Sequence, residues 1–173
     1  MDETSLFLEQ ENKEIKKLYI EYCHAEWNAL MNGKKEDYEK SSEKEVRYRE
    51  YFNNKERFEK VKNLLKTIKD PLEKRQLDLL YNEYLASQGD LELIKNIAKI
   101  SSEINHKFNT FRANLDGKEL TDNEIKTILK KETDSEIRKR AWEASKNQGA
   151  SIEKDVLELV KLRNTLARGL GFD

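Results

Sequence analysis

The 173 residues suffice for one domain with a hydrophobic core, and a composition of 36% hydrophobic and 39% charged residues with one proline favours solvated helices. Its 33 lysines and arginines are interspersed among 34 aspartates and glutamates, which argues against a nucleic-acid-binding surface. The single cysteine excludes an internal disulfide, and the sequence shows neither a signal peptide nor a membrane span. We therefore expect a cytoplasmic, all-α protein with a single helical domain over residues 1–173.

Two helices are predicted in the first third of the chain, from apolar residues that recur at steps of three and four. The first runs from residue 4 to about 32, with Thr4 or Ser5 as its N-cap, and ends at Gly33. The second covers about residues 35–52. Its inner side is less apolar than that of the first helix, which suggests a half-exposed position; it carries Tyr38, Ser42, Val46, Arg49 and Phe52.

Three more helices are predicted before residue 110. Asn53 and Asn54 mark a break, after which a third helix carries a clear apolar stripe. Asp70 followed by Pro71 starts the fourth helix, because aspartate accepts hydrogen bonds from free N–H groups and proline suits the first helical position. The fourth helix closes at Gly89, and Asp90 caps the fifth.

The helical pattern weakens near residues 108–120, where Asp116 and Gly117 form a tight-turn pair. We predict one small β-hairpin here. The alternative is a helix that ends near Asn114 and is followed by a loop.

The C-terminal third is predicted to contain three helices. Thr121 with Glu124, and Thr133 with Glu136, have the spacing of capping boxes that start the first two. The second is expected to stop at Gly149, and the last covers about residues 151–168. Short connections between all elements predict an antiparallel multi-helix bundle, and the frequent Gly and Pro breaks exclude a long coiled coil.

Catalytic and metal-binding motifs are missing from the sequence. A zinc peptidase of the HExxH type places two imidazoles one helical turn apart with a glutamate between them. Here His24 and His106 are far apart, and neither has a second histidine four residues later. Cys23 and the adjacent His24 point about 100° apart on a helix and cannot easily share a proton, so we expect Cys23 to be a small core residue. We predict no catalytic residue and no metal ligand in this chain.

Aromatic residues at helical spacing could line a peptide groove, but they more often form a core. We expect a core position for Trp27, Tyr81, Tyr84, Phe108, Phe111 and Trp142.

Three segments resemble a known family. Residues 70–90 read DPLEKRQLDLLYNEYLASQGD, residues 116–129 read DGKELTDNEIKTIL, and residues 141–173 begin with AWEASK and end with the Arg163-Asn164 pair and Gly171-Phe172. Together they resemble the helical N-terminal region of zinc metallopeptidases of the angiotensin-converting-enzyme and oligoendopeptidase (thimet-oligopeptidase-like) group. The resemblance covers residues 70–172; the first 60 residues share only helical character.

The resemblance implies an N-terminal helical lid over the substrate cleft of a zinc-dependent, oligopeptide-hydrolysing enzyme. This chain would not be catalytic alone. The zinc ligands would lie in a C-terminal catalytic domain, so that zinc is bound only by the full-length enzyme. The substrate would be an oligopeptide. The alternative is a stand-alone helical binding or scaffold protein without the catalytic half. Structural or cleft-lining candidates are Arg75, Tyr81, Trp142, Lys146, Arg163 and Asn164.

One of these candidates departs from the family pattern. Converting enzymes have an arginine in the Trp142 helix that helps to hold a chloride ion, and the matching position here is Lys146. The last helix should expose an apolar face without its catalytic partner, and could then form a homodimer. That face comprises Ile152, Val156, Leu159, Val160 and Leu166. We expect no nucleic-acid or membrane partner.

Overall fold

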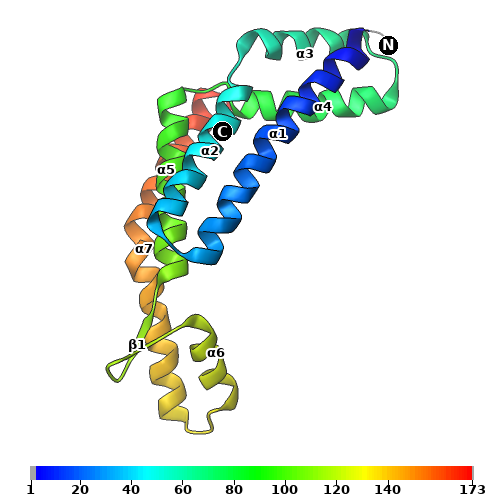
Figure 1. The fold of residues 1–173 in the computed structure, drawn as a ribbon. Coiled ribbons are helices and arrows are strands. Elements are labelled where there is room, and N and C mark those ends of the chain that lie inside the picture. The colour runs from blue at the N-terminus through cyan, green and yellow to red at the C-terminus, as the bar shows by residue number, and fades with distance from the viewer. Residues whose placement is uncertain (1–2, 173) are drawn as a thin grey trace.

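The computed structural model describes residues 3–172 and contains seven helices and one β-hairpin (Figure 1). The predicted all-α class with a small hairpin is confirmed. The elements are α1 (Glu3–Asn32), α2 (Lys35–Phe52), α3 (Lys55–Thr67), α4 (Pro71–Ala86), α5 (Leu91–Thr110), β1 (Ala113–Leu115), β2 (Lys118–Leu120), α6 (Asp122–Lys131) and α7 (Ser135–Gly169).

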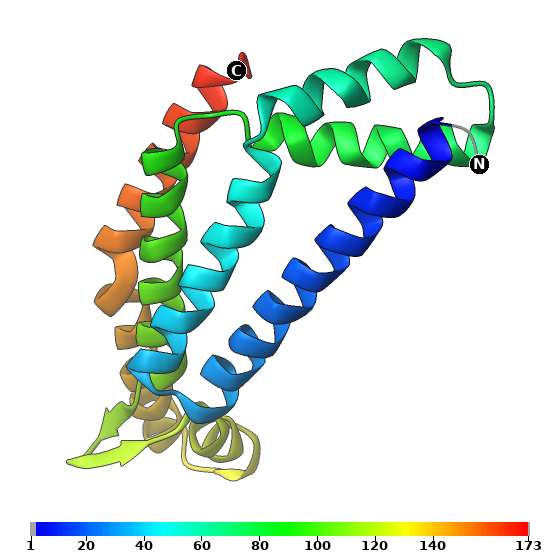
Figure 2. The same cartoon turned by 45° about the horizontal axis from the view of Figure 1, so that its top comes forward.

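The four longest helices form one elongated layer in the order α1, α2, α5, α7, and each is antiparallel to its neighbour (Figures 1 and 2). The α3–α4 pair crosses one end of this layer. At the other end, the antiparallel β1–β2 hairpin and α6 pack against the first half of α7. Because the layer is one helix thick, much of each helix has no helical neighbour to cover it.

Most predicted helix boundaries are confirmed by the hydrogen bonds at the caps. The Asp70 carboxylate accepts from the backbone N–H groups of Leu72 and Glu73, at 2.9 and 2.8 Å, and Asp90 caps α5 by accepting from the Leu93 N–H at 2.7 Å. Thr121 and Glu124 form a complete capping box at the start of α6. Gly33 ends α1 with φ of 65°, a left-handed conformation that favours glycine.

Four boundary predictions are wrong. Gly149 lies inside the continuous helix α7, because one glycine costs only about 1 kcal/mol within a long, otherwise favourable helix. Asp134, and not Thr133, caps α7, since its carboxylate accepts from two N–H groups of the first turn. Thr4 and Ser5 lie within α1, which already includes Glu3. Finally, α4 ends at Ala86, three residues before Gly89.

Two separate clusters of buried residues hold the two ends of the layer. The first, which we call the aromatic core, lies between α1, α2, α3 and α4. It comprises Phe7, Leu8, Phe52, Phe58, Val61, Leu77, Leu80 and Tyr84. The second, here the hairpin core, joins the β-hairpin, α6 and α7 and comprises Ala113, Leu120, Ile125, Ala141 and Ala144. Within residues 3–172, none of the helices has a stretch apolar enough to cross a lipid bilayer.

The prediction that the aromatic residues are core residues is wrong for three of them. Tyr84 is fully buried and Tyr81 packs beside it, but Trp27, Phe108 and Trp142 are 65%, 48% and 51% exposed. These three side chains lie on helix sides that a single layer of helices leaves uncovered. Cys23, expected in the core, is only half-buried.

Candidate functional site

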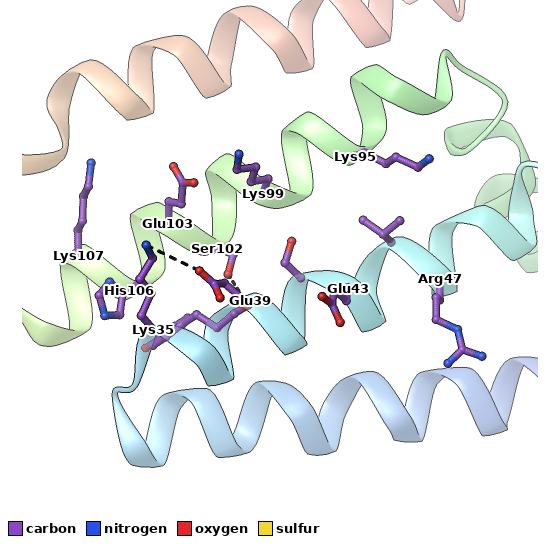
Figure 3. Close-up of a pocket in the computed structure, with 13 residues that line it drawn as sticks. Lys35, Glu39, Glu43, Arg47, Lys95, Lys99, Ser102, Glu103, His106 and Lys107 are labelled. Atoms are coloured by element: carbon purple, nitrogen blue, oxygen red, sulfur yellow. Dashed lines mark hydrogen bonds and ion pairs between the residues drawn. The ribbon is translucent and has the colours of Figure 1, made fainter.

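A groove of about 850 Å³ lies between α2 and α5 (Figure 3). Charged residues one helical turn apart form each rim, because residues four apart share a helix face. The rim on α2 consists of Lys35, Glu39, Glu43 and Arg47, and the rim on α5 consists of Lys95, Lys99, Glu103 and Lys107. Twelve residues of helix correspond to about 18 Å, so the groove could hold several residues of an extended peptide.

The floor of the groove is built around Tyr38, which is buried and held from three sides. Ser102 Oγ donates to the Tyr38 carbonyl oxygen at 2.8 Å, and Asn109 Nδ2 donates to the Tyr38 hydroxyl at 3.1 Å. The His106 ring packs against Tyr38 with ring centroids 5.1 Å apart. Ser42 and Val46 complete the floor from α2, the side that the sequence predicted to be half-exposed.

Several rim cations are paired with acids outside the groove. Lys107 Nζ lies 2.5 Å from Asp155 Oδ2, and Lys95 Nζ lies 3.1 Å from Glu92 and 3.5 Å from Glu50. Hydrogen bonds to these carboxylates raise the pKa of both lysines above the usual value, so both stay charged at neutral pH. Because the rims carry charges of both signs, the groove suits a polar or charged peptide segment.

The other rim residues are paired less completely. Arg47 lies 3.5 Å from Glu21, and Lys35 lies 3.7 Å from Glu39 across one turn. Within residues 3–172, no ion pair engages Lys99, Glu43 or Glu103. These three charges are therefore free to meet groups of a bound segment.

A smaller, polar pocket of about 230 Å³ adjoins the groove and shares Tyr38, Ser42 and Ser102 with it. It opens between α1, α2, α5 and α7. Arg163 of α7 reaches this pocket and donates to Ser101 Oγ at 3.2 Å. The pocket wall also carries Tyr22, Glu26, Ser41, Glu45 and Asn105.

The other predicted site residues are not gathered around the groove. Arg75 and Tyr81 lie on α4, at the end of the layer with the aromatic core. Trp142 and Lys146 lie on the first half of α7, where the Lys146 ammonium sits 5.0 Å from the Trp142 ring centroid. Asn164 is exposed near the end of α7.

A charged cluster around a buried carboxylate was not found by sequence reasoning. Glu11 of α1 is only 2% exposed; it accepts from Tyr84 Oη at 2.7 Å and pairs with Arg57 at 2.9 Å. Arg57 also donates to the Tyr51 hydroxyl, so the cluster ties α1 to α2, α3 and α4. The signal was present: Glu11 falls among Phe7, Leu8 and Ile15 on the apolar side of α1.

The described residues do not fit a zinc ion. Within residues 3–172, no three histidine, cysteine, aspartate or glutamate side chains come together as metal ligands. His24 is exposed on α1, whereas His106 packs on Tyr38 in the groove floor. No step of zinc chemistry can therefore be assigned to this chain.

The fold defines an all-α protein with an elongated groove between α2 and α5. Comparison of the sequence with family models gives a match to Peptidase_M2, described as "Angiotensin-converting enzyme", over residues 1–173. The chain belongs to this family of metallopeptidases, as its resemblance implied. No curated protein and no solved structure matches the chain.

Proposed function

We propose that this chain is the N-terminal helical lid of a zinc-dependent oligopeptidase and lines one wall of its peptide cleft. The observation that carries the proposal is the match to the angiotensin-converting enzyme family over the whole of residues 1–173. We also propose that the enzyme belongs to the oligoendopeptidase-like group, that it is cytoplasmic, and that residues 1–173 form one domain. The catalytic domain that holds the zinc is then a further part of the same protein.

The exposed side of α7 supports a docking role toward such a catalytic domain. Val156, Leu157 and Val160 are 36%, 55% and 46% exposed, whereas the neighbouring Leu159 is buried. Exposed apolar residues on adjacent turns are typical of a surface that another structural unit covers. The expected apolar face is therefore only partly exposed, since Ile152 and Leu166 are half-buried.

The α2–α5 groove supports a role in peptide binding. Its rims offer charges of both signs, and Ser42 and His106 add polar groups at its floor. We propose that unfolded peptide segments contact this groove on their way to the catalytic centre. The candidates Arg75, Tyr81, Trp142, Lys146, Arg163 and Asn164 remain proposed structural or cleft-lining residues.

The proposal is tested by the mass of the native gene product and by the activity of the isolated chain. We expect a product well above 20.5 kDa whose additional sequence contains HExxH. The isolated 173-residue chain should neither retain stoichiometric zinc after dialysis nor hydrolyse an unstructured peptide. Stoichiometric zinc together with peptide hydrolysis by this chain would overturn the lid proposal.

The second candidate is a stand-alone binding protein. The groove favours it, because α2 and α5 of this chain supply all the residues that line the groove. A native product of about 20.5 kDa would select it. The groove should then bind unstructured peptides, and Lys99→Glu together with Lys107→Glu should weaken that binding. A Lys130→Glu variant on α6, outside the groove, is the matched control.

A further inference from the structure

The smaller, polar pocket beside the groove lies between four helices and is lined by charges of both signs. Its volume of about 230 Å³ is below the roughly 300–1,000 Å³ of pockets that bind drug-sized molecules. Its walls come from α1, α2, α5 and, through Arg163, α7. A ligand of this pocket would therefore be small, and it would contact helices that are not neighbours in the layer.

Two residues of opposite charge in this pocket have no charged partner. Within residues 3–172, no ion pair engages either Glu26 of α1 or Arg163 of α7. Burial, followed by the nearby Glu45 and Glu26 carboxylates, raises the pKa of Tyr22 above its usual value, which places Glu26 close to the Tyr22 hydroxyl. A guanidinium has five N–H donors, and the bond to Ser101 Oγ at 3.2 Å uses one of those of Arg163. The pocket thus offers one free carboxylate and one guanidinium with free donors.

A buried hydroxyl in the pocket wall also has no hydrogen-bond partner. Ser41 is 8% exposed and lines the pocket, and its hydroxyl forms no hydrogen bond to another group of residues 3–172. Since no completely enclosed side-chain oxygen or nitrogen in that part of the chain lacks a partner, this hydroxyl is open to the pocket. Buried polar groups are normally hydrogen-bonded, because leaving one without a partner costs free energy. The Ser41 hydroxyl therefore points to a polar ligand.

We propose that this pocket binds a small α-amino acid through both of its charged groups. The Arg163 guanidinium binds the carboxylate, whose two oxygens match two parallel N–H groups. The Glu26 carboxylate binds the ammonium group, and the Ser41 hydroxyl adds a hydrogen bond. Both charged groups of the ligand are attached to one carbon atom, which suits a pocket of this volume. Ser42 and Asn105 make the rest of the wall polar, so the ligand's side chain is small and polar, as in serine.

Other small ligands would satisfy fewer of these groups. A carboxylate without an amine would leave Glu26 unpaired, and an amine without a carboxylate would leave Arg163 unpaired. Glu45 also lines the pocket and is paired with Arg49 at 2.7 Å, so a phosphate dianion would meet two carboxylates beside one guanidinium. A zwitterion gives each of the two free charges an opposite one. The inference does not rest on the lid proposal, since every group belongs to this chain, and either can fail without the other.

Isothermal titration calorimetry of the 173-residue chain with L-serine tests the site. We expect a dissociation constant on the order of 0.1 mM. N-Acetyl-L-serine lacks the ammonium group and L-serinamide lacks the carboxylate. Each should bind at least about tenfold more weakly, because a hydrogen bond between charged groups is lost. Absence of binding by both L-serine and glycine at millimolar concentration, or equal binding of L-serine and its two derivatives, would overturn the proposal.

Charge-removing variants locate the binding at the two free charges. Arg163→Gln and Glu26→Gln should each weaken L-serine binding at least about tenfold. Arg168→Gln on α7 and Glu9→Gln on α1, at exposed positions outside the pocket, are the matched controls and should leave the affinity unchanged. Circular dichroism verifies that all four variants remain helical. Equal weakening in the variants and their controls would show a general effect of surface charge and would overturn the site.

Ser41→Ala tests the buried hydroxyl separately from the charges. Since this hydroxyl has no partner in the described chain, Ser41→Ala should keep the melting temperature and weaken L-serine binding several-fold. Bound L-serine should raise the melting temperature of the unmodified chain, because a ligand that binds only the folded state stabilises it, and the rise should be absent in Arg163→Gln. Unchanged L-serine affinity of Ser41→Ala would contradict the placement of the ligand in this pocket.

Discussion

The two ends of the helical layer are stabilised in different ways. The aromatic core joins four helices through large side chains and encloses the charged cluster of Glu11, Arg57 and Tyr84. The hairpin core is small, and three of its five buried residues are alanines. A core of large interdigitating side chains loses stability when side-chain volume or a buried partner is removed. A core of alanines brings helix backbones close together, so it loses stability when volume is added.

The largest effect is expected from removing the buried carboxylate. Glu11→Ala should lower the free energy of unfolding by about 3 kcal/mol, because Arg57 and Tyr84 lose a partner inside the aromatic core. Arg57 is itself partly exposed, which limits the loss. Urea denaturation gives the value, and Glu143→Ala on the exposed side of α7 is the control, with a change within about 0.5 kcal/mol. Equal effects of the two variants would contradict the role of the cluster.

A decrease in side-chain volume in one core and an increase in the other should each destabilise the protein, and these two changes distinguish how the cores are packed. Leu77→Ala, at a fully buried position of the aromatic core, should cost about 3 kcal/mol by leaving a cavity. Ala141→Leu, at a fully buried position of the hairpin core, should cost about 2 kcal/mol by overpacking. Thermal and urea unfolding measure both. If Ala141→Leu stabilised the protein, the hairpin core would contain free space, which would contradict the proposed difference in packing between the two cores.

Two glycines, Gly89 between α4 and α5 and Gly149 within α7, should change stability with opposite signs when replaced by alanine. A Cβ at Gly89 would overlap Leu166 Cδ1 of α7, so Gly89→Ala should cost about 1 kcal/mol while Leu166 changes its rotamer. A Cβ at Gly149 meets no atom within 4 Å, so Gly149→Ala should stabilise α7 by up to about 1 kcal/mol. Combining Gly89→Ala with Leu166→Ala should relieve the overlap, and a double-mutant cycle measures the coupling.

The smallest effect is expected at alkaline pH and comes from half-buried tyrosines, two of which, Tyr48 and Tyr51, pack against the aromatic core. Burial raises the pKa of both Tyr48 and Tyr51 to about 12. Since the unfolded chain loses these protons at the usual tyrosine pKa of 10.0, their contribution to stability is complete below pH 10 and declines as the pH rises toward 12. Phenolate absorbance against pH should show these two tyrosines titrating late, together with Tyr22 and Tyr84, whose pKa burial also raises. Ionisation of all tyrosines near pH 10 in the folded protein would contradict it.

Local features of the sequence determined the secondary structure. The periodicity of apolar residues indicated the first five helices, and Asp70, Asp90 and the Thr121–Glu124 capping box gave three starting points. The Asp116-Gly117 turn gave the hairpin, in which both residues have positive φ. These features succeed because capping, turns and helical periodicity depend on residues within a few positions of one another.

Tertiary structure decided which helix sides are covered and which groups meet. Glu11 became buried because α3 and α4 supply Arg57 and Tyr84, which lie 46 and 73 residues away. The groove exists because α2 and α5 lie antiparallel, which aligns two rows of charges that are unremarkable in either helix alone. Trp27 is exposed because α1 is the edge of a single layer. Periodicity identifies an apolar helix side, but only packing determines whether this chain covers it.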